Sequence, residues 1–156
     1  MEITIVNIIQ AMLAPGIMIS ACGLLLLGMN NKYSLIVNRL RLLEEEKRKL
    51  TMSPKKGNLN EDEELRLRSI KMQIEKISSR IRIVRNAVFS YSVAIVFFIC
   101  SSLFIGLHYL ITNNFITGLA AEFFLAGMLS VMIGVIFAAK EVTKGYEIVL
   151  IEINEG

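Results

Sequence analysis

Between residues 30 and 86 the chain reads NNKYSLIVNRLRLLEEEKRKLTMSPKKGNLNEDEELRLRSIKMQIEKISSRIRIVRN. This stretch holds fifteen of the chain's seventeen Lys and Arg residues, against eight of its Asp and Glu residues. The rest of the chain is strongly apolar, and the mean hydropathy of the whole is +0.56. Because loops rich in Lys and Arg stay in the cytoplasm, this polar segment sets the orientation of everything on either side of it.

Three apolar runs flank the polar segment, at residues 3–29, 87–111 and 116–139. Each exceeds the roughly 20 residues that an α-helix needs to cross the hydrocarbon core. The short, uncharged connection at 112–115 is typical of a tight extracytoplasmic turn. We therefore predict an all-α integral membrane protein with three transmembrane helices, its N-terminus outside and its hairpin and C-terminus cytoplasmic. The tail, 140–156, is compatible with a helix or a short strand.

The polar segment itself has the pattern of two helical arms joined by a loop at 51–60, which contains Pro54 and Gly57. Apolar residues recur at alternating spacings of three and four in both arms, which predicts a long antiparallel coiled-coil hairpin. The returning arm shows the clearest seam: Leu67, Ile70, Ile74, Ile77, Ile81, Val84 and Val88. This seam is either simply the hydrophobic core of the hairpin or part of a docking arm for another protein.

Glu122 is the only ionisable residue between Thr117 and Ala139. An ionisable group at membrane depth is costly and normally faces a bundle interior, a partner or a water-filled cavity, so Glu122 is a candidate ion or proton site. The competing interpretation makes it a structural partner of Asn7, Gln10 or Ser residues.

A polar stripe runs along one face of the second span, formed by Ser90, Ser101 and His108. These residues are candidates to line an ion or proton path with Glu122. Alternatively, the serines join helices through hydrogen bonds, and His108 is an interfacial anchor at the end of its helix.

Small residues predict where helices approach closely, because they let two backbones come together. The candidates are Ala14, Ala21 and Gly28 in the first span and Gly127 and Gly134 in the third.

Basic residues near the membrane are candidate contacts for anionic lipid headgroups, each worth about 1 kcal/mol near the surface. They are Lys32, Arg39, Arg41, Arg82 and Arg85.

Several function classes find no support in the sequence. One His, no HExxH motif and no phosphate-binding Gly-rich loop argue against an enzyme, and no cofactor is expected. Cys22 and Cys100 both lie in apolar runs without a CxxC neighbour, which argues against a metal site or a disulfide. Interleaved acids and the absence of Trp argue against nucleic-acid binding.

The opening of the chain resembles a bacterial domain-of-unknown-function family of small three-span membrane proteins. The resemblance rests on residues 14–16, 19–21, 24–27, 31–34 and 37–41, and departs from the family at Lys32, where Arg is expected, and Asn38, where Asp is expected. It implies a bacterial inner-membrane protein.

A more distant likeness is to the MotA/TolQ/ExbB proton-channel family, which shares the order of spans and cytoplasmic segments. The stretch 118–122, Gly-Leu-Ala-Ala-Glu, is similar to the Gly-x-Ala-Glu pattern that begins the third span in that family, with the Glu one place later. The Pro expected lower in that span is absent, since Val135 and Ile136 stand there. The likeness implies a pentamer that conducts protons together with a partner membrane protein.

Two functional hypotheses follow. In the first, the protein is a homo-oligomeric pore or proton- or ion-channel-like subunit whose second and third spans line a central path. In the second, it is a membrane-anchored scaffold or signalling adaptor, whose basic hairpin binds lipid headgroups or another protein.

Overall fold

The computed structural model describes residues 5–52, 61–111 and 114–154. Every residue in these ranges is helical, in three long helices: α1 (Ile5–Met52), α2 (Glu61–Ile111) and α3 (Asn114–Asn154). Each contains a window long and apolar enough to cross a membrane. The predicted all-α, multi-pass membrane fold is therefore confirmed.

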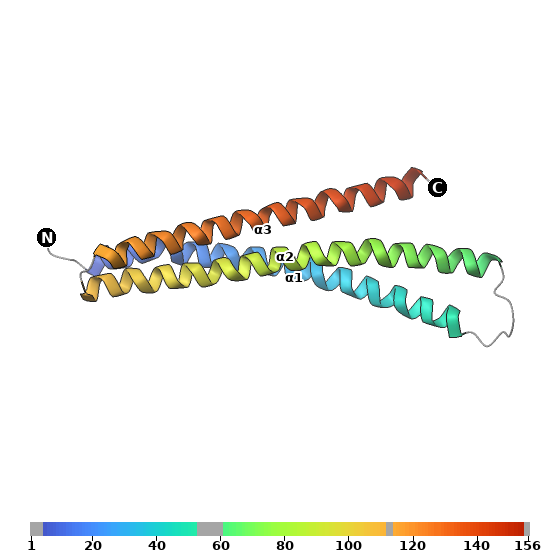
Figure 1. Ribbon diagram of the computed structural model, residues 1–156, viewed down its shortest axis with the longest axis horizontal. Coiled ribbons are helices and arrows are strands. Elements are labelled where there is room, and N and C mark those ends of the chain that lie inside the picture. The colour runs from blue at the N-terminus through green and yellow to red at the C-terminus, as the bar shows by residue number, and fades with distance from the viewer. Residues whose placement is uncertain (1–4, 53–60, 112–113, 155–156) are drawn as a thin grey trace.

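The helices run alongside one another, with α2 packed against both neighbours while α1 and α3 scarcely touch (Figure 1). We call the end where α2 leads into α3 the turn end, and the end where α1 leads into α2 the hairpin end. Towards the hairpin end, α1 separates from α2, and α3 stands apart from the other two (Figure 1). Packing is therefore concentrated in the part of the bundle that contains the apolar runs.

The observed boundaries differ from the predicted ones in a few places. Thr51 and Met52, expected in the loop at 51–60, belong to α1, and α3 begins at Asn114, two residues before the predicted span. Residues 53–60 and 112–113, which carry the rest of the predicted loop and the start of the predicted turn, lie outside the described residues. The tail 140–154 is helical and continues α3 through Gly145, because one internal glycine costs a helix only about 1 kcal/mol.

Buried residues recur at seven-residue intervals along α2 and α1. On α2 they are Ile70, Ile77, Val84, Tyr91 and Phe98, and on α1 they are Pro15, Cys22 and Met29. A seven-residue repeat keeps one stripe of a helix facing its neighbour over many turns. One stripe therefore runs unbroken from the polar arm of α2 into its apolar run.

The close approach of α3 to α2 depends on two glycines. A Cβ atom added to Gly127 would lie 2.7 Å from Cε1 of Phe98, and one added to Gly134 would lie 2.6 Å from Cε1 of Tyr91. Both rings are buried, so each fills the notch that a glycine leaves. Since lipid tails are as apolar as the side chains, this van der Waals contact, rather than the hydrophobic effect, holds such helices together.

Replacing Gly127 by alanine tests this packing. We expect Gly127→Ala to lower the free energy of unfolding by about 1 to 3 kcal/mol, because the Phe98 ring must shift within a filled interior. Gly23→Ala is the matched control, since an added Cβ there meets nothing within 4 Å. The measurement is unfolding of both variants in mixed micelles, followed by circular dichroism. Equal stability of the two variants would contradict the packing role of Gly127.

Candidate functional site

Glu122 lies on the exposed side of α3. The face of α3 that packs on α2 carries Ala120, Gly127 and Gly134, all buried. At 100° per residue, Glu122 is displaced by about 160°, 140° and 120° from Ala120, Gly127 and Gly134, and it is exposed, so its side chain projects away from the face that packs on α2. It is about 12 Å along the helix axis from Asn114, within the apolar run. Among the residues that the structure describes, Glu122 has no hydrogen-bond or ion-pair partner.

The polar stripe of α2 lies largely inside the bundle. Ser101 is buried, and its hydroxyl donates a hydrogen bond of 2.8 Å to the carbonyl oxygen of Ala120. About three turns towards the hairpin end, the hydroxyl of Ser130 donates to the carbonyl oxygen of Ser90, also at 2.8 Å. These hydrogen bonds join α2 to α3, which is the helix-joining alternative that the sequence left open for the serines.

His108 joins the same two helices at the turn end. Its Nδ1 lies 3.0 Å from the hydroxyl oxygen of Thr117, near the start of α3. Its ring also meets the ring of Tyr109 edge-on, with centroids 5.6 Å apart. The structure thus places His108 where it ties the end of α2 to α3.

A groove of about 270 Å³ opens between α1 and α3 near the turn end. Ala11 and Pro15 of α1 form one wall, Ala121 and Phe124 of α3 the other, and Ile105 of α2 part of the floor. No ionisable side chain is among the residues that line it. The groove therefore holds no charged group, and Ser101 and Thr117 are its polar lining residues.

The small residues divide between the inside and the outside of the bundle. Gly127 and Gly134 pack against α2, whereas Ala14, Ala21 and Gly28 are exposed on α1. The buried stripe of α1 lies one residue further along, at positions 15, 22 and 29. The predicted α1 seam is thus exposed, with Ala14 among the residues that line the groove between α1 and α3.

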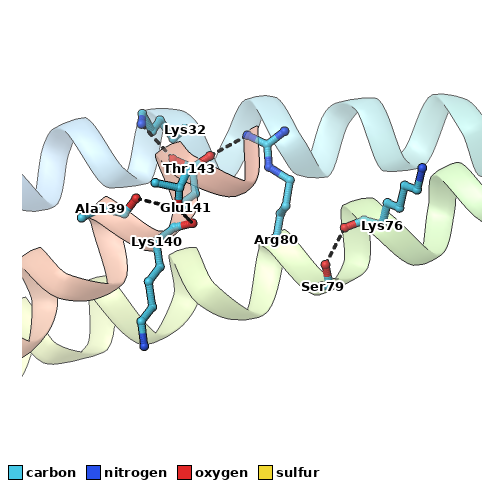
Figure 2. Close-up of polar contacts among 8 residues, drawn as sticks. All are labelled: Lys32, Lys76, Ser79, Arg80, Ala139, Lys140, Glu141 and Thr143. Atoms are coloured by element: carbon cyan, nitrogen blue, oxygen red, sulfur yellow. Dashed lines mark hydrogen bonds and ion pairs between the residues drawn. The ribbon is translucent and has the colours of Figure 1, made fainter. Parts of the chain in front are cut away.

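Four of the five predicted headgroup contacts are exposed, with no ion pair to a described residue: Arg39, Arg41, Arg82 and Arg85. The fifth, Lys32, has a different environment. Its ammonium group donates to Oε2 of Glu141 at 2.9 Å, and Arg80 donates from Nη2 to Oε1 of the same carboxylate at 2.6 Å (Figure 2). We call these three residues the Lys32–Arg80–Glu141 triad.

The triad connects all three helices, because Lys32 belongs to α1, Arg80 to α2 and Glu141 to α3. Only 3% of the Glu141 side chain is exposed, against 25% for Arg80 and 47% for Lys32. Glu141 is the second residue after the apolar run 116–139, so the triad lies where the spans end. It is also one of the few links between α1 and α3.

The charges of the triad determine the ionisation of Glu141. Burial by itself raises the pKa of Glu141, but the hydrogen bonds and positive charges of Arg80 and Lys32 outweigh it, so the pKa lies below its ordinary value of 4.5. A carboxyl group with a lowered native pKa stabilises the fold at pH above its ordinary pKa, and this contribution is lost as the pH falls through the native pKa. Glu141 is therefore ionised at neutral pH.

Arg80 and Glu141 were not among the candidates from the sequence, although a signal for Glu141 was present. Glu141 follows Gly127 and Gly134 at the same seven-residue spacing, so it lies on the α3 face that packs against α2. An acidic residue on an inward-facing stripe requires cationic partners. Nothing in the spacing of the basic residues distinguishes Lys32 and Arg80 from the exposed ones.

Neutralising Glu141 tests the triad. We expect Glu141→Gln to lower the free energy of unfolding at pH 7 by about 3 to 5 kcal/mol, because it leaves the charge of Arg80 partly buried without a counterion. The difference from the wild type should vanish in acid, once the wild-type carboxyl is itself protonated. Glu45→Gln removes an exposed partner of Lys49 and should change little. If Glu141→Gln lowered the free energy of unfolding as little as Glu45→Gln does, the stabilising role of the triad would be contradicted.

Comparison with known proteins identifies the family of the chain. No curated protein and no solved structure matches the chain. The model of one family, described as "Protein of unknown function (DUF2721)", matches residues 12–151. This match covers residues 12–29 of the first apolar run, the other two apolar runs, the hairpin and the triad, and the chain therefore belongs to the DUF2721 family.

Proposed function

We propose that the protein is one subunit of a homo-oligomeric pore of the bacterial inner membrane, in which the outward face of α3 lines a central path for protons or other cations. The observation that carries this proposal is the position of Glu122. Its carboxyl projects from the bundle at membrane depth, and it has no partner among the described residues.

A carboxylate facing lipid is costly, at about 3 kcal/mol near the centre of a transmembrane helix. That cost is avoided if several copies turn the same face of α3 towards a common axis. Glu122 of each copy then meets water or polar groups instead of lipid. The distant likeness to the MotA/TolQ/ExbB family favours five copies around this axis.

The outer face of α1 supplies a surface for contact between neighbouring copies. Ala14, Ala21 and Gly28 are exposed there at seven-residue spacing, and a Cβ added to Gly28 meets nothing within 4 Å. Small residues in such a row let a helix from the next copy approach closely.

The polar residues of α2 have a supporting role in this arrangement. The Ser101 hydroxyl is already used in a hydrogen bond to α3, as is the Ser90 carbonyl. These two hydrogen bonds hold α3 against α2, so that the outer face of α3, rather than a face of α2, lines the path. His108 fastens the turn end of the same pair.

Proton flux through liposomes containing the purified protein tests the proposal. We expect Glu122→Gln to reduce the flux by about tenfold or more, equivalent to raising the barrier by about 1.4 kcal/mol or more, because it removes the ionisable group from the path. The readout is a pH-sensitive dye trapped inside the liposomes, with a potassium gradient as the driving force.

Glu44→Gln is the matched control, since it removes the same charge from an exposed position of the hairpin. Its flux should equal that of the wild type. The oligomeric state of each variant in nanodiscs should be unchanged. Flux through Glu122→Gln equal to that of the wild type would remove Glu122 from the mechanism, and a monomeric wild type would leave no central path.

We propose a scaffold or signalling adaptor as the second candidate function, supported by the exposed arginines. Arg39 and Arg41 lie on the arm of α1, and Arg82 and Arg85 lie on α2. In this hypothesis the two arms form a coiled-coil hairpin in the cytoplasm, and its arginines contact anionic headgroups or another protein.

Charge reversal distinguishes the second function from the first. Replacing Arg39, Arg41, Arg82 and Arg85 together by Glu should weaken co-sedimentation of the nanodisc-embedded protein with added vesicles that contain anionic lipid, because each cation near the surface contributes about 1 kcal/mol. Proton flux per inserted protein should stay unchanged. Unaltered co-sedimentation would argue against the adaptor.

A further inference from the structure

The Arg80 guanidinium makes an incomplete contact with its carboxylate. Nη2 donates to Glu141, but the neighbouring Nε is buried and has no hydrogen-bond partner among the described residues. A guanidinium and a carboxylate commonly form two parallel hydrogen bonds, and a buried donor without a partner is costly. The side of Arg80 that faces Glu141 therefore has one donor more than it uses.

The hairpin shows how an arginine in this chain uses both donors. Nε and Nη2 of Arg66 both donate to Oε1 of Glu46, at 3.0 and 2.8 Å. The second oxygen of Glu46 is not shared with another cation in any described contact. At Glu141, in contrast, the second oxygen is occupied by the ammonium group of Lys32.

In the arrangement of two parallel hydrogen bonds, each donor has an oxygen of its own, so Nε of Arg80 would need Oε2 of Glu141, the oxygen that Lys32 now occupies. If Lys32 withdrew, the carboxylate could turn so that Oε2 meets Nε while Oε1 stays on Nη2. Lys32 is able to withdraw, because 47% of its side chain is exposed, while Glu141 is almost fully buried. The loss of one charged contact is offset by another, so the carboxylate remains paired in both arrangements.

The position of the triad indicates what would attract Lys32. The triad lies where the apolar runs end, since Lys32 is three residues beyond the buried Met29 on α1. Two cations and one anion leave the triad with an excess positive charge. At that level of a bilayer, the abundant anionic groups are the phosphates of lipid headgroups.

We propose that the triad is a binding site for the phosphate of an anionic lipid, which takes Lys32 from Glu141 while the carboxylate closes onto both donors of Arg80. Lipid binding then breaks the Lys32–Glu141 link between α1 and α3 and leaves the α2–α3 link intact. Free phosphate offers the same chemistry without the acyl chains that keep a lipid at this level.

Lipid retention measured by native mass spectrometry tests the site, with phosphatidylglycerol as the anionic probe and phosphatidylcholine as the reference lipid. Lys32→Gln should weaken retention of phosphatidylglycerol by about fivefold, as expected for one cation near the surface. Lys140→Gln is the matched control, because Lys140 is exposed at the same level and points away from the triad (Figure 2). Its effect should be clearly smaller. Equal losses in the two variants would reduce the site to general surface charge and overturn the proposal.

Arg80→Lys tests the second half of the rearrangement. Lysine keeps the charge but lacks the planar pair of donors, so the carboxylate gains nothing by leaving Lys32. We expect weaker phosphatidylglycerol retention than in the wild type, at unchanged net charge. Retention equal to the wild type would show that Arg80 plays no part. If circular dichroism shows that Arg80→Lys does not fold, the comparison of Lys32→Gln with Lys140→Gln decides the proposal.

One further arm identifies the source of the phosphate. Inorganic phosphate added at concentrations similar to that of the lipid should leave phosphatidylglycerol bound. Displacement would assign the site to free phosphate and overturn the lipid proposal. Because retention is measured without any flux, a protein that fails to conduct protons can still bind the lipid, and the two proposals are judged separately.

Discussion

The close packing of α3 on α2 is the constraint on which the rest of the structure depends. Two glycines of α3, Gly127 and Gly134, receive the buried rings of Phe98 and Tyr91, so the two helices meet with one fixed rotation. Hydrogen bonds from Ser101 and Ser130 reinforce the same pairing. With this face of α3 committed to α2, the opposite face, and Glu122 with it, has to point out of the bundle.

The same rotation accounts for the buried charge. Glu141 is one heptad beyond Gly134, so the stripe that packs in the apolar region brings a carboxylate inward just where the apolar run ends. Its two cationic partners come from the other two helices. The rotation of α3 against α2 thus places Glu141 inside the bundle and Glu122 outside it. Glu141 needs cations from its own chain. Glu122 needs polar surroundings, which the described residues of one chain do not provide.

This contrast separates the structural acid from the functional candidate. Glu141 is paired with two positive charges, those of Lys32 and Arg80, which favour its ionised form and join the helices. Glu122 is surrounded by exposed apolar residues such as Leu125 and Leu129, with nothing in the described chain to compensate its charge. The Glu122 carboxylate, which is costly in a single copy facing lipid, would avoid that cost if several copies assembled around it.

The sequence alone determined the helical class, the three apolar runs and the two polar helical arms between the first and second runs, because hydropathy and the spacing of apolar residues are local properties of the chain. It also singled out Gly127 and Gly134 as residues of close packing. It did not show that Ala14, Ala21 and Gly28 face outward, since the buried stripe of α1 lies only one residue away. Nor did it single out Lys32 and Arg80 among fifteen cations in the polar segment. Only the tertiary structure decided these points, because the rotation of each helix depends on how side chains of different helices fit together.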